Sequence, residues 1–193
     1  MAPTLATALW PADTVNARVA RNVLLALVGT LALTISAKVQ IPFWPVPMTM
    51  QTFVVLVIGM AYGTRLGVAT MALYLLEGAL GLPVFAGTPE KGIGLGYMMG
   101  PTGGYLLGFV ASAWLCGWLA ERGFDRSPVK TLLAMSLGHA LIFVCGVAWL
   151  AQLIGFEKAF ATGVVPFWAA TIAKTLLGVA TLPLAWKWIG RLK

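Results

Sequence analysis

Residues 129–154 read VKTLLAMSLGHALIFVCGVAWLAQLI, and after Lys130 this stretch contains no Asp, Glu, Lys or Arg. About 20 mostly apolar residues are enough for a helix to cross the hydrocarbon core of a bilayer. The rest of the chain has the same character: 60% of its 193 residues are hydrophobic and only 10% are charged. A soluble globule of this size has too little interior for so many apolar side chains. The composition therefore predicts a polytopic membrane protein and excludes a cytosolic enzyme, a nucleic-acid-binding domain and a disordered chain.

Six apolar stretches have the length and composition of membrane helices. They run from about Arg18 to Lys38, Thr49 to Tyr62, Leu66 to Leu80, Pro101 to Ala120, Val129 to Ile154 and Pro166 to Trp188. The second and third are short for full spans, so we expect them to be tilted, broken or partly re-entrant. We predict an all-α integral membrane protein whose residues 1–193 form a single six-helix domain, with residues 1–17 as a cytoplasmic N-terminal segment.

The basic residues are distributed unevenly between the two sides of this six-span arrangement. Nine of the 13 Lys and Arg residues fall on the side of the two termini, three fall on the other side, and Lys174 lies within the last span. Because positively charged loops stay in the cytoplasm, both termini are predicted to be cytoplasmic. The same residues are scattered between apolar blocks and form no basic patch, so the net charge of +7 does not indicate nucleic-acid binding.

Two of the predicted outer loops are unusual. The first, Lys38 to Met48, has three prolines in six residues, which favours extended backbone; its apolar side chains suit either a plug against helix ends or a lid over a ligand pocket. The second, Gly81 to Tyr105, is rich in glycine, which lets backbone approach a ligand closely. Neither a dinucleotide fingerprint nor a P-loop is present, so we expect no cofactor.

Lys174 is the one fully charged residue deep in a predicted span, about eight residues from its outer end. A lysine near the bilayer centre costs about 2.5–3.5 kcal/mol on insertion scales. Either it awaits an anionic or carbonyl-bearing substrate, or it pairs with Glu77 or snorkels toward the surface. Thr171 lies one turn earlier on the same helical face, where its hydroxyl reaches the same ligand or its own backbone.

Other features favour ordinary packing. Ser136 and His139 share a helix, but no oxyanion donors or nucleophile motif accompany them, so we expect no enzyme. Cys116 and Cys145 lie in apolar blocks without metal-ligand spacing, and no metal site is expected. Small residues form a stripe on the first span and recur at i and i+4 on the fourth, which indicates internal packing or docking to a second membrane subunit.

Three stretches resemble the BioY family, the biotin-specific substrate-binding (S) components of energy-coupling factor (ECF) transporters. They are Ile41–Pro42 with Val46–Phe53, Gly78–Gly87, and Gly100–Tyr105; the fifth span is also similar, with Gly138, Gly146 and Trp149–Leu150. The resemblance implies the six-helix S-component fold, a biotin pocket near the outer surface of the bacterial plasma membrane, and coupling to a transmembrane subunit driven by two ATPase subunits. Lys174 matches a lysine of the family's last helix, and Thr171 stands where the family has an aspartate.

The resemblance also implies which residues bind. The expected biotin-binding set is Lys174, Thr171, Phe43, Trp44, Thr49, Gln51, Phe85, Ala86, Gly87, Tyr97, Pro101, Thr102, Gly103, Gly104 and Tyr105. The expected face for the coupling subunit is Ala26, Gly29, Ala32 and Ser36. Aromatic side chains of the first set are expected around the apolar bicycle of biotin, and Lys174 with loop backbone groups at its polar ends.

Two alternatives stay open at this point. The chain could be a self-sufficient secondary transporter or facilitator for a small vitamin-like solute, although it shows no inverted repeat and only one buried charge for ion coupling. It could also be a structural subunit that binds no ligand, which binding measurements on purified protein would reveal.

Overall fold

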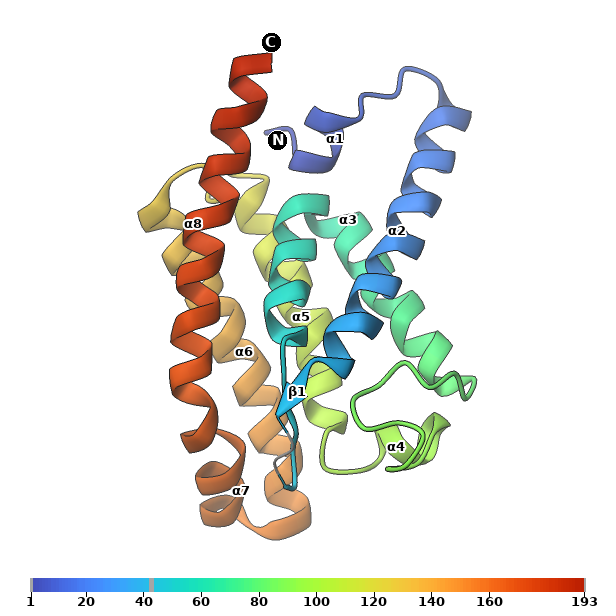
Figure 1. Ribbon diagram of the computed structural model, residues 1–193, viewed down its shortest axis with the longest axis vertical. Helices are drawn as coiled ribbons and strands as arrows, with labels where there is room; N and C mark the ends of the chain where they lie inside the picture. Colours follow the sequence, from blue (N-terminus) through green and yellow to red (C-terminus); the bar gives the residue numbers. More distant parts are fainter. Residues whose placement is uncertain (1, 42–43, 193) are drawn as a thin grey trace.

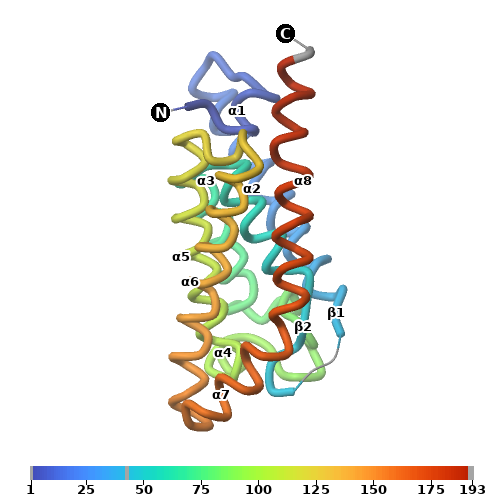
Figure 2. Tube along the Cα trace, turned by 90° about the vertical axis from the view of Figure 1, so that its left-hand side faces the viewer, coloured from blue at the N-terminus to red at the C-terminus, as the bar shows by residue number. Residues whose placement is uncertain are grey.

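The computed structural model describes residues 2–41 and 44–192 and is a bundle of long helices (Figure 1). In order, its elements are α1 (Leu5–Leu9), α2 (Val15–Lys38), β1 (Gln40–Ile41), β2 (Met48–Thr49), α3 (Gln51–Ala79), α4 (Gly94–Met98), α5 (Gly103–Ala120), α6 (Pro128–Ile154), α7 (Phe156–Gly163), the 3₁₀ helix η1 (Val165–Phe167) and α8 (Trp168–Leu192). The two termini lie at the same end of the bundle, in both side views (Figures 1 and 2).

Five segments are long enough and apolar enough to cross a membrane, by length and composition. They are Val15–Lys38, Gln51–Ala79, Gly103–Ala120, Pro128–Ile154 and Phe156–Gly190. The last of these combines α7, η1 and α8. The prediction of an all-α membrane protein is therefore confirmed at this level, whereas the count of six spans is not reproduced as six separate helices.

The two short predicted spans, 49–62 and 66–80, correspond to the two halves of α3 on either side of Gly63, and α3 counts once among the five segments. Gly63 interrupts α3 with φ 81° and ψ 178°, a conformation that a residue with a Cβ rarely adopts. Figure 1 shows the chain rising along the first half of α3 and returning along the second half. The Glu121 carboxylate accepts a hydrogen bond from the Thr64 N–H at 2.8 Å, and so caps the second half where it begins.

The centre of the bundle is α5, which packs against α3 on one side and α6 on the other. Small residues allow this contact. A Cβ added at Gly104 would strike Trp149 and the carbonyl oxygen of Cys145 on α6, and one at Gly108 would lie 2.9 Å from the Ile142 Cα. The small-residue pattern predicted on this helix therefore packs internally, as one of the two alternatives stated.

The N-terminal segment folds across the end of the bundle that carries both termini. Arg21 on α2 donates from Nη1 to the Trp10 carbonyl at 2.9 Å, and the Ala2 N–H donates to the Glu121 carbonyl at 2.9 Å. These bonds tie the predicted cytoplasmic segment to α2 and to the α5–α6 connection.

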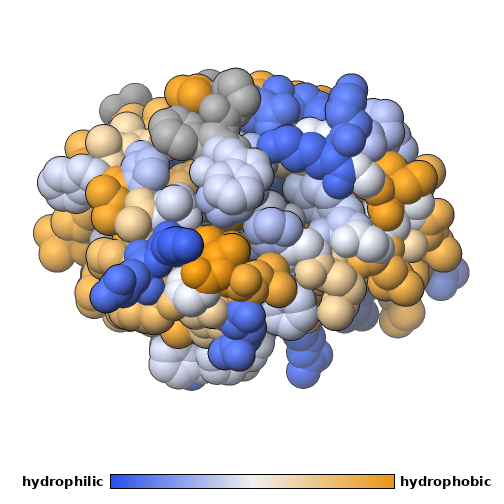
Figure 3. Space-filling model, turned by 90° about the horizontal axis from the view of Figure 1, so that it is seen from below, coloured by the Kyte–Doolittle hydropathy of each residue, from blue (hydrophilic) through white to orange (hydrophobic). Residues whose placement is uncertain are grey.

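The opposite end is built from short elements that cover the helix ends. Strands β1 and β2 pair antiparallel, with Gln40 opposite Thr49 and Ile41 opposite Met48. This hairpin is the extended backbone expected of the first outer loop. The second outer loop contains α4, and the third, for which the sequence predicts no structure, forms α7. Charged and apolar side chains are mixed over this end of the molecule, while apolar ones dominate at its left and right margins (Figure 3).

Candidate functional site

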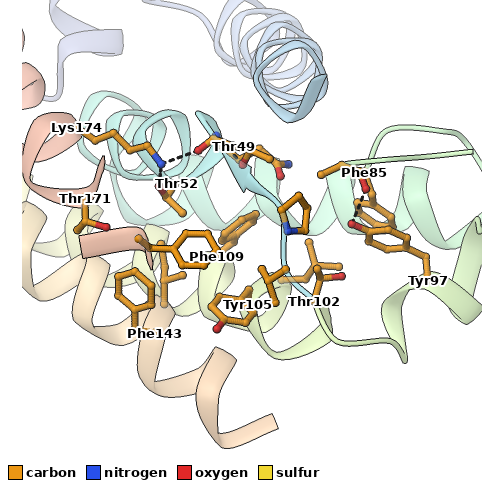
Figure 4. Close-up of a pocket in the computed structure, with 17 residues that line it drawn as sticks. Thr49, Thr52, Phe85, Tyr97, Thr102, Tyr105, Phe109, Phe143, Thr171 and Lys174 are labelled. Atoms are coloured by element: carbon orange, nitrogen blue, oxygen red, sulfur yellow. Dashed lines mark hydrogen bonds between the residues drawn. The ribbon is translucent and has the colours of Figure 1, made fainter. Parts of the chain in front are cut away.

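A cavity lies beneath the short elements, between the ends of α3, α5, α6 and α8 (Figure 4). Its free volume is about 50 Å³, well below the roughly 300–1,000 Å³ of typical small-molecule pockets. Its lining is Val46, Pro47, Thr49, Gln51, Thr52, Phe85, Ala86, Tyr97, Thr102, Tyr105, Leu106, Phe109, Ile142, Phe143, Phe167, Thr171 and Lys174. The cavity is thus mostly apolar and narrow, with a few polar groups.

Lys174 on α8 supplies the cationic group of this cavity. It is only 7% exposed, and its Nζ donates to the Thr49 carbonyl at 2.6 Å and to the Thr52 hydroxyl at 3.1 Å. Both hydrogen-bond partners are neutral groups. In the described part of the chain, Glu77 makes no hydrogen bond to Lys174. The ammonium group carries three N–H donors, so one donor and the full positive charge remain for a ligand. The two alternatives to ligand binding, a pair with Glu77 and a side chain that snorkels to the surface, are both wrong in the described part of the chain.

Aromatic rings form the walls between the polar groups. Tyr105 on α5 and Phe143 on α6 meet edge to face, with centroids 6.5 Å apart and planes at 87°. The Tyr105 hydroxyl is turned away to the Gly163 carbonyl, to which it donates at 2.9 Å, so the ring presents its apolar face. Phe109 lies close to these rings in Figure 4. Such walls suit a flat or bicyclic apolar group.

At the other side of the cavity, side chains from three elements hold the segment 84–88 by its carbonyl groups. Tyr74 donates to the Val84 carbonyl at 2.8 Å and Tyr97 to the Ala86 carbonyl at 2.8 Å. Lys38, at the end of α2, donates to the Phe85 carbonyl at 3.0 Å and to the Thr88 carbonyl at 2.9 Å. Burial raises the pKa of the Tyr97 hydroxyl, which keeps it protonated as a donor.

The Phe85 ring is fixed in the same way from all sides. It stacks on Tyr97 with centroids 5.0 Å apart and meets the Tyr74 ring edge to face at 5.4 Å. Its tip rests on Gly78 of α3, where an added Cβ would overlap the ring. The Gly78–Gly87 stretch of the sequence therefore supplies both the ring and the notch that receives it.

Most of the binding residues expected from sequence are brought together here. Nine line the cavity: Lys174, Thr171, Thr49, Gln51, Phe85, Ala86, Tyr97, Thr102 and Tyr105. Gly87, Pro101, Gly103 and Gly104 adjoin lining residues without lining it themselves, and Trp44 is 80% exposed and lies outside the lining. Phe43 lies outside the described residues.

Sequence reasoning missed eight lining residues, four of which lie on α5 and α6. They are Val46, Pro47, Thr52, Leu106, Phe109, Ile142, Phe143 and Phe167. The first three belong to the Val46–Phe53 stretch that carries the family resemblance, so Thr52 could have been predicted from the sequence. The aromatic and aliphatic residues carry no such signal, because in sequence a pocket-facing Phe is indistinguishable from one that packs in the core.

The small-residue stripe of the first span faces the interior of this chain. Gly29 and Ser36 are buried, and a Cβ at Gly29 would lie 2.5 Å from the Thr70 side chain on α3. Ala26 and Ala32 are half-buried. Gly29 therefore packs against α3 and Ser36 is covered by the chain, which corrects the expectation that all four residues form a docking face.

His139 on α6 has a packing role in this structure. Its Nδ1 lies 3.1 Å from the Met135 carbonyl and 3.2 Å from the Thr175 hydroxyl on α8, and Ser136 is not a partner. No group of three His, Cys, Asp or Glu side chains in the described part of the chain is placed to hold a metal ion.

Comparison with known proteins identifies the family. The model of the BioY family matches residues 7–191. The chain belongs to the BioY family. It is 34% identical over 160 residues to a protein of Pyrococcus horikoshii named probable biotin transporter BioY, which covers 83% of this chain and 93% of the relative. The biotin transporter BioY of Thermotoga maritima is 38% identical over 148 residues, 76% of this chain and 85% of the relative.

The fold of this BioY chain is also that of a solved structure. A crystal structure of the S-component for biotin from an ECF-type ABC transporter superposes with a TM-score of 0.77, covering 91% of this chain and 95% of that one, at 23% sequence identity. The S-component fold and the family resemblance are thus confirmed. The chain is a multi-pass membrane protein of a transporter family, so the prediction that it is not an enzyme is also confirmed.

Proposed function

We propose that this BioY chain binds biotin in the cavity beside Lys174 and delivers it across the membrane as the S component of an ATP-driven uptake system. The observation that carries the proposal is the buried Lys174 ammonium, held only by neutral groups in an aromatic-lined cavity of a BioY member. An uncompensated cation is costly in a membrane interior unless a ligand or another group satisfies it. Biotin offers oxygen atoms for the ammonium and an apolar bicycle for the rings.

The proposed ligand contacts are the lining residues. The rings of Phe85, Tyr97 and Tyr105 flank the bicycle, and Lys174 with Thr171 meets a polar end. The free space is too narrow for a bicyclic molecule as it stands, so binding requires the hairpin and the 81–93 segment to move outward and close again. In this proposal the two outer loops act as a lid over the cavity.

We further propose six membrane crossings, with both halves of α3 spanning and both termini cytoplasmic. The excess of Lys and Arg at the terminal end supports this orientation, and the S-component fold is compatible with it. In this arrangement the cavity opens toward the outside. Because this chain contains no P-loop, the energy for release into the cytoplasm comes from partners: a transmembrane coupling subunit and two ATPase subunits. Ala26 and Ala32 are the residues of the α2 stripe that stay partly accessible to such a subunit.

Equilibrium binding to detergent-purified protein tests the ligand. We expect biotin to bind, desthiobiotin to bind more weakly because it lacks the fused sulfur ring that the aromatic walls enclose, and thiamine not to bind. Saturable binding of thiamine in place of biotin would refute the assignment. Uptake of labelled biotin at full rate in cells that lack the ATPase subunits would refute the coupling and favour a self-sufficient transporter.

A single methyl group at Gly78 tests the position of Phe85. In Gly78→Ala the new Cβ overlaps the Phe85 ring, so the ring must leave its place at the cavity wall. We expect biotin affinity to fall about tenfold, the order expected when a buried ring contact worth about 0.5–1.5 kcal/mol is lost. The matched control is Gly96→Ala, whose Cβ meets nothing within 4 Å. Equal affinities of the two variants would show that Phe85 does not contact the ligand.

A further inference from the structure

A second hollow, which we call the α2–α3 groove, lies at the end of the bundle that carries both termini. Its free volume is about 780 Å³, within the roughly 300–1,000 Å³ of small-molecule pockets. The helices α2 and α3 meet at Gly29 and Thr70, and Figure 1 shows α2 crossing the second half of α3, with the two helices apart toward the terminal end. The groove lies between these two helices, and α1 and the end of α5 complete its lining.

Arg21 lines this groove as a buried cation without an acidic partner. It is only 8% exposed, and in the described part of the chain its guanidinium donates only to the Trp10 carbonyl and to the side-chain oxygen of Asn22. These bonds use three of the five N–H donors of an arginine. Arginine is almost never fully buried unless it is paired. The positive charge and the two remaining donors therefore indicate an anion supplied from outside the chain.

A second guanidinium group and one carboxylate also face the groove. Arg65, at the start of the second half of α3, is exposed and makes no hydrogen bond or ion pair with any described residue. The Glu121 carboxylate is already used, because it accepts the hydrogen bond from the Thr64 N–H at 2.8 Å. Two guanidinium groups and one carboxylate give the lining a net charge of +1. The groove is thus electrostatically suited to a negatively charged ligand.

The charged and apolar parts of the groove follow the order of the parts of a phospholipid. Both α2 and the second half of α3 run away from the terminal end, and the two arginines come early on them, with Ala26 and Leu73 further along. Tyr62 and Trp118 also line the groove. Tyrosine and tryptophan are enriched at the level of the lipid headgroups. The arginines therefore lie at headgroup level, and the apolar lining continues toward the hydrocarbon core.

We propose that the α2–α3 groove binds one anionic phospholipid of the leaflet at the terminal end, with its phosphate on Arg21 and Arg65 and part of an acyl chain along the apolar lining. Arginine binds phosphate through paired N–H donors, and basic pockets between membrane helices bind anionic headgroups. A zwitterionic headgroup fits less well, because it brings a cation of its own beside two guanidinium groups. This site lies at the opposite end of the bundle from the ligand cavity, and it does not depend on the proposed binding of biotin.

The experiment measures lipid binding to the full chain, delipidated in detergent, by native mass spectrometry. The probes are phosphatidylglycerol, phosphatidylcholine with the same acyl chains, and glycerol 3-phosphate, which has no acyl chain. Arg21→Gln and Arg65→Gln each remove one cation from the groove. The matched control is Arg18→Gln, because Arg18 is exposed on the same end of α2 and lies outside the groove lining. Thermal unfolding is the second measurement, since a ligand that binds only the folded state stabilises it.

We expect one phosphatidylglycerol to bind, about tenfold more tightly than phosphatidylcholine, and to raise the unfolding temperature. Arg65→Gln should weaken this binding about fivefold and Arg21→Gln about tenfold or more, with the control unchanged. Arg65→Gln keeps the test decisive if Arg21→Gln does not fold, because Arg65 has no partner in the described part of the chain.

Three results would overturn the proposal. Equal binding of the two lipids, or unchanged phosphatidylglycerol binding in Arg65→Gln, would show that the arginines do not select a headgroup. Displacement of the lipid by an equal concentration of glycerol 3-phosphate would show a site for soluble phosphate compounds. Variants that keep the lipid but no longer associate with the coupling subunit would show that the groove docks a protein instead.

Discussion

Lys174→Met is expected to weaken biotin binding roughly ten- to a hundredfold without destabilising the protein. The loss follows because a hydrogen bond to a charged group contributes about 1.5–3 kcal/mol, and methionine keeps the length of the side chain without the donor. The fold is spared because removing a buried ammonium saves about 2.5–3.5 kcal/mol on insertion scales. This saving offsets the unpaired Thr49 carbonyl that remains. In Lys174→Met the affinity for biotin should therefore fall while the free energy of unfolding stays the same or rises.

The measurement pairs ligand titration with thermal unfolding in the same detergent. Lys158→Met is the matched control, because Lys158 is exposed on α7 and lies outside the cavity lining. It should change neither quantity. If Lys174→Met binds biotin as tightly as the unchanged chain, the ammonium serves α8 packing alone and the proposed site is wrong. A large loss of stability with unchanged affinity would lead to the same conclusion.

Gly104→Ala is expected to destabilise the bundle by about 1–3 kcal/mol, the usual penalty for overpacking a close contact. The added Cβ overlaps Trp149 and the backbone carbonyl oxygen of Cys145, and backbone atoms cannot rotate away as a side-chain tip can. To relieve the overlap, α5 and α6 must separate along their whole contact. In a helix face without a close neighbour, the same Gly→Ala change would stabilise the protein by roughly 0.5–1 kcal/mol. The sign of the change in unfolding free energy therefore shows whether Gly104 is in close contact with α6.

Thermal unfolding and the yield of monodisperse protein report this effect. Gly96→Ala is again the matched control, since its Cβ is unobstructed. Because Gly104 lies in the first turn of α5, next to the cavity residue Tyr105, biotin affinity should fall together with stability. A variant as stable as the control would mean that α5 and α6 are further apart than the structure places them.

The sequence was sufficient to identify the kind of protein and most of its polar site. The charge-free stretch that follows Lys130 and the isolated Lys174 are local signals, because the free energy of placing each residue type in a bilayer depends little on its neighbours. The proline and glycine stretches were likewise readable, since those residues restrict or free the backbone wherever they occur. The resemblance to the BioY family implies Thr49, Gln51, Phe85 and Tyr97 as binding residues, and all four line the cavity.

Other features depend on partners far away in the chain. Gly63 separates the two halves of α3, and its positive φ is visible only in the structure. Gly29 packs against α3 and Ser36 is buried within the chain, because the rotation of a helix is set by what each of its faces meets. Phe109 and Phe143 line the cavity only because α5 and α6 bring them to the same level.

The amino-acid sequence alone therefore determined that the chain lies in a membrane and that its basic residues concentrate on the side of the two termini. It also determined that one lysine lies within a span, and that the outer loops are rich in proline and glycine. Only the tertiary structure decided what that ammonium contacts, which aromatic rings face the cavity, and that Tyr74, Lys38 and Tyr97 donate to the carbonyls of residues 84, 85 and 86. The physical reason is range: transfer into lipid acts residue by residue, whereas a hydrogen bond between Lys38 and Phe85 exists only after 47 positions of chain have been folded back.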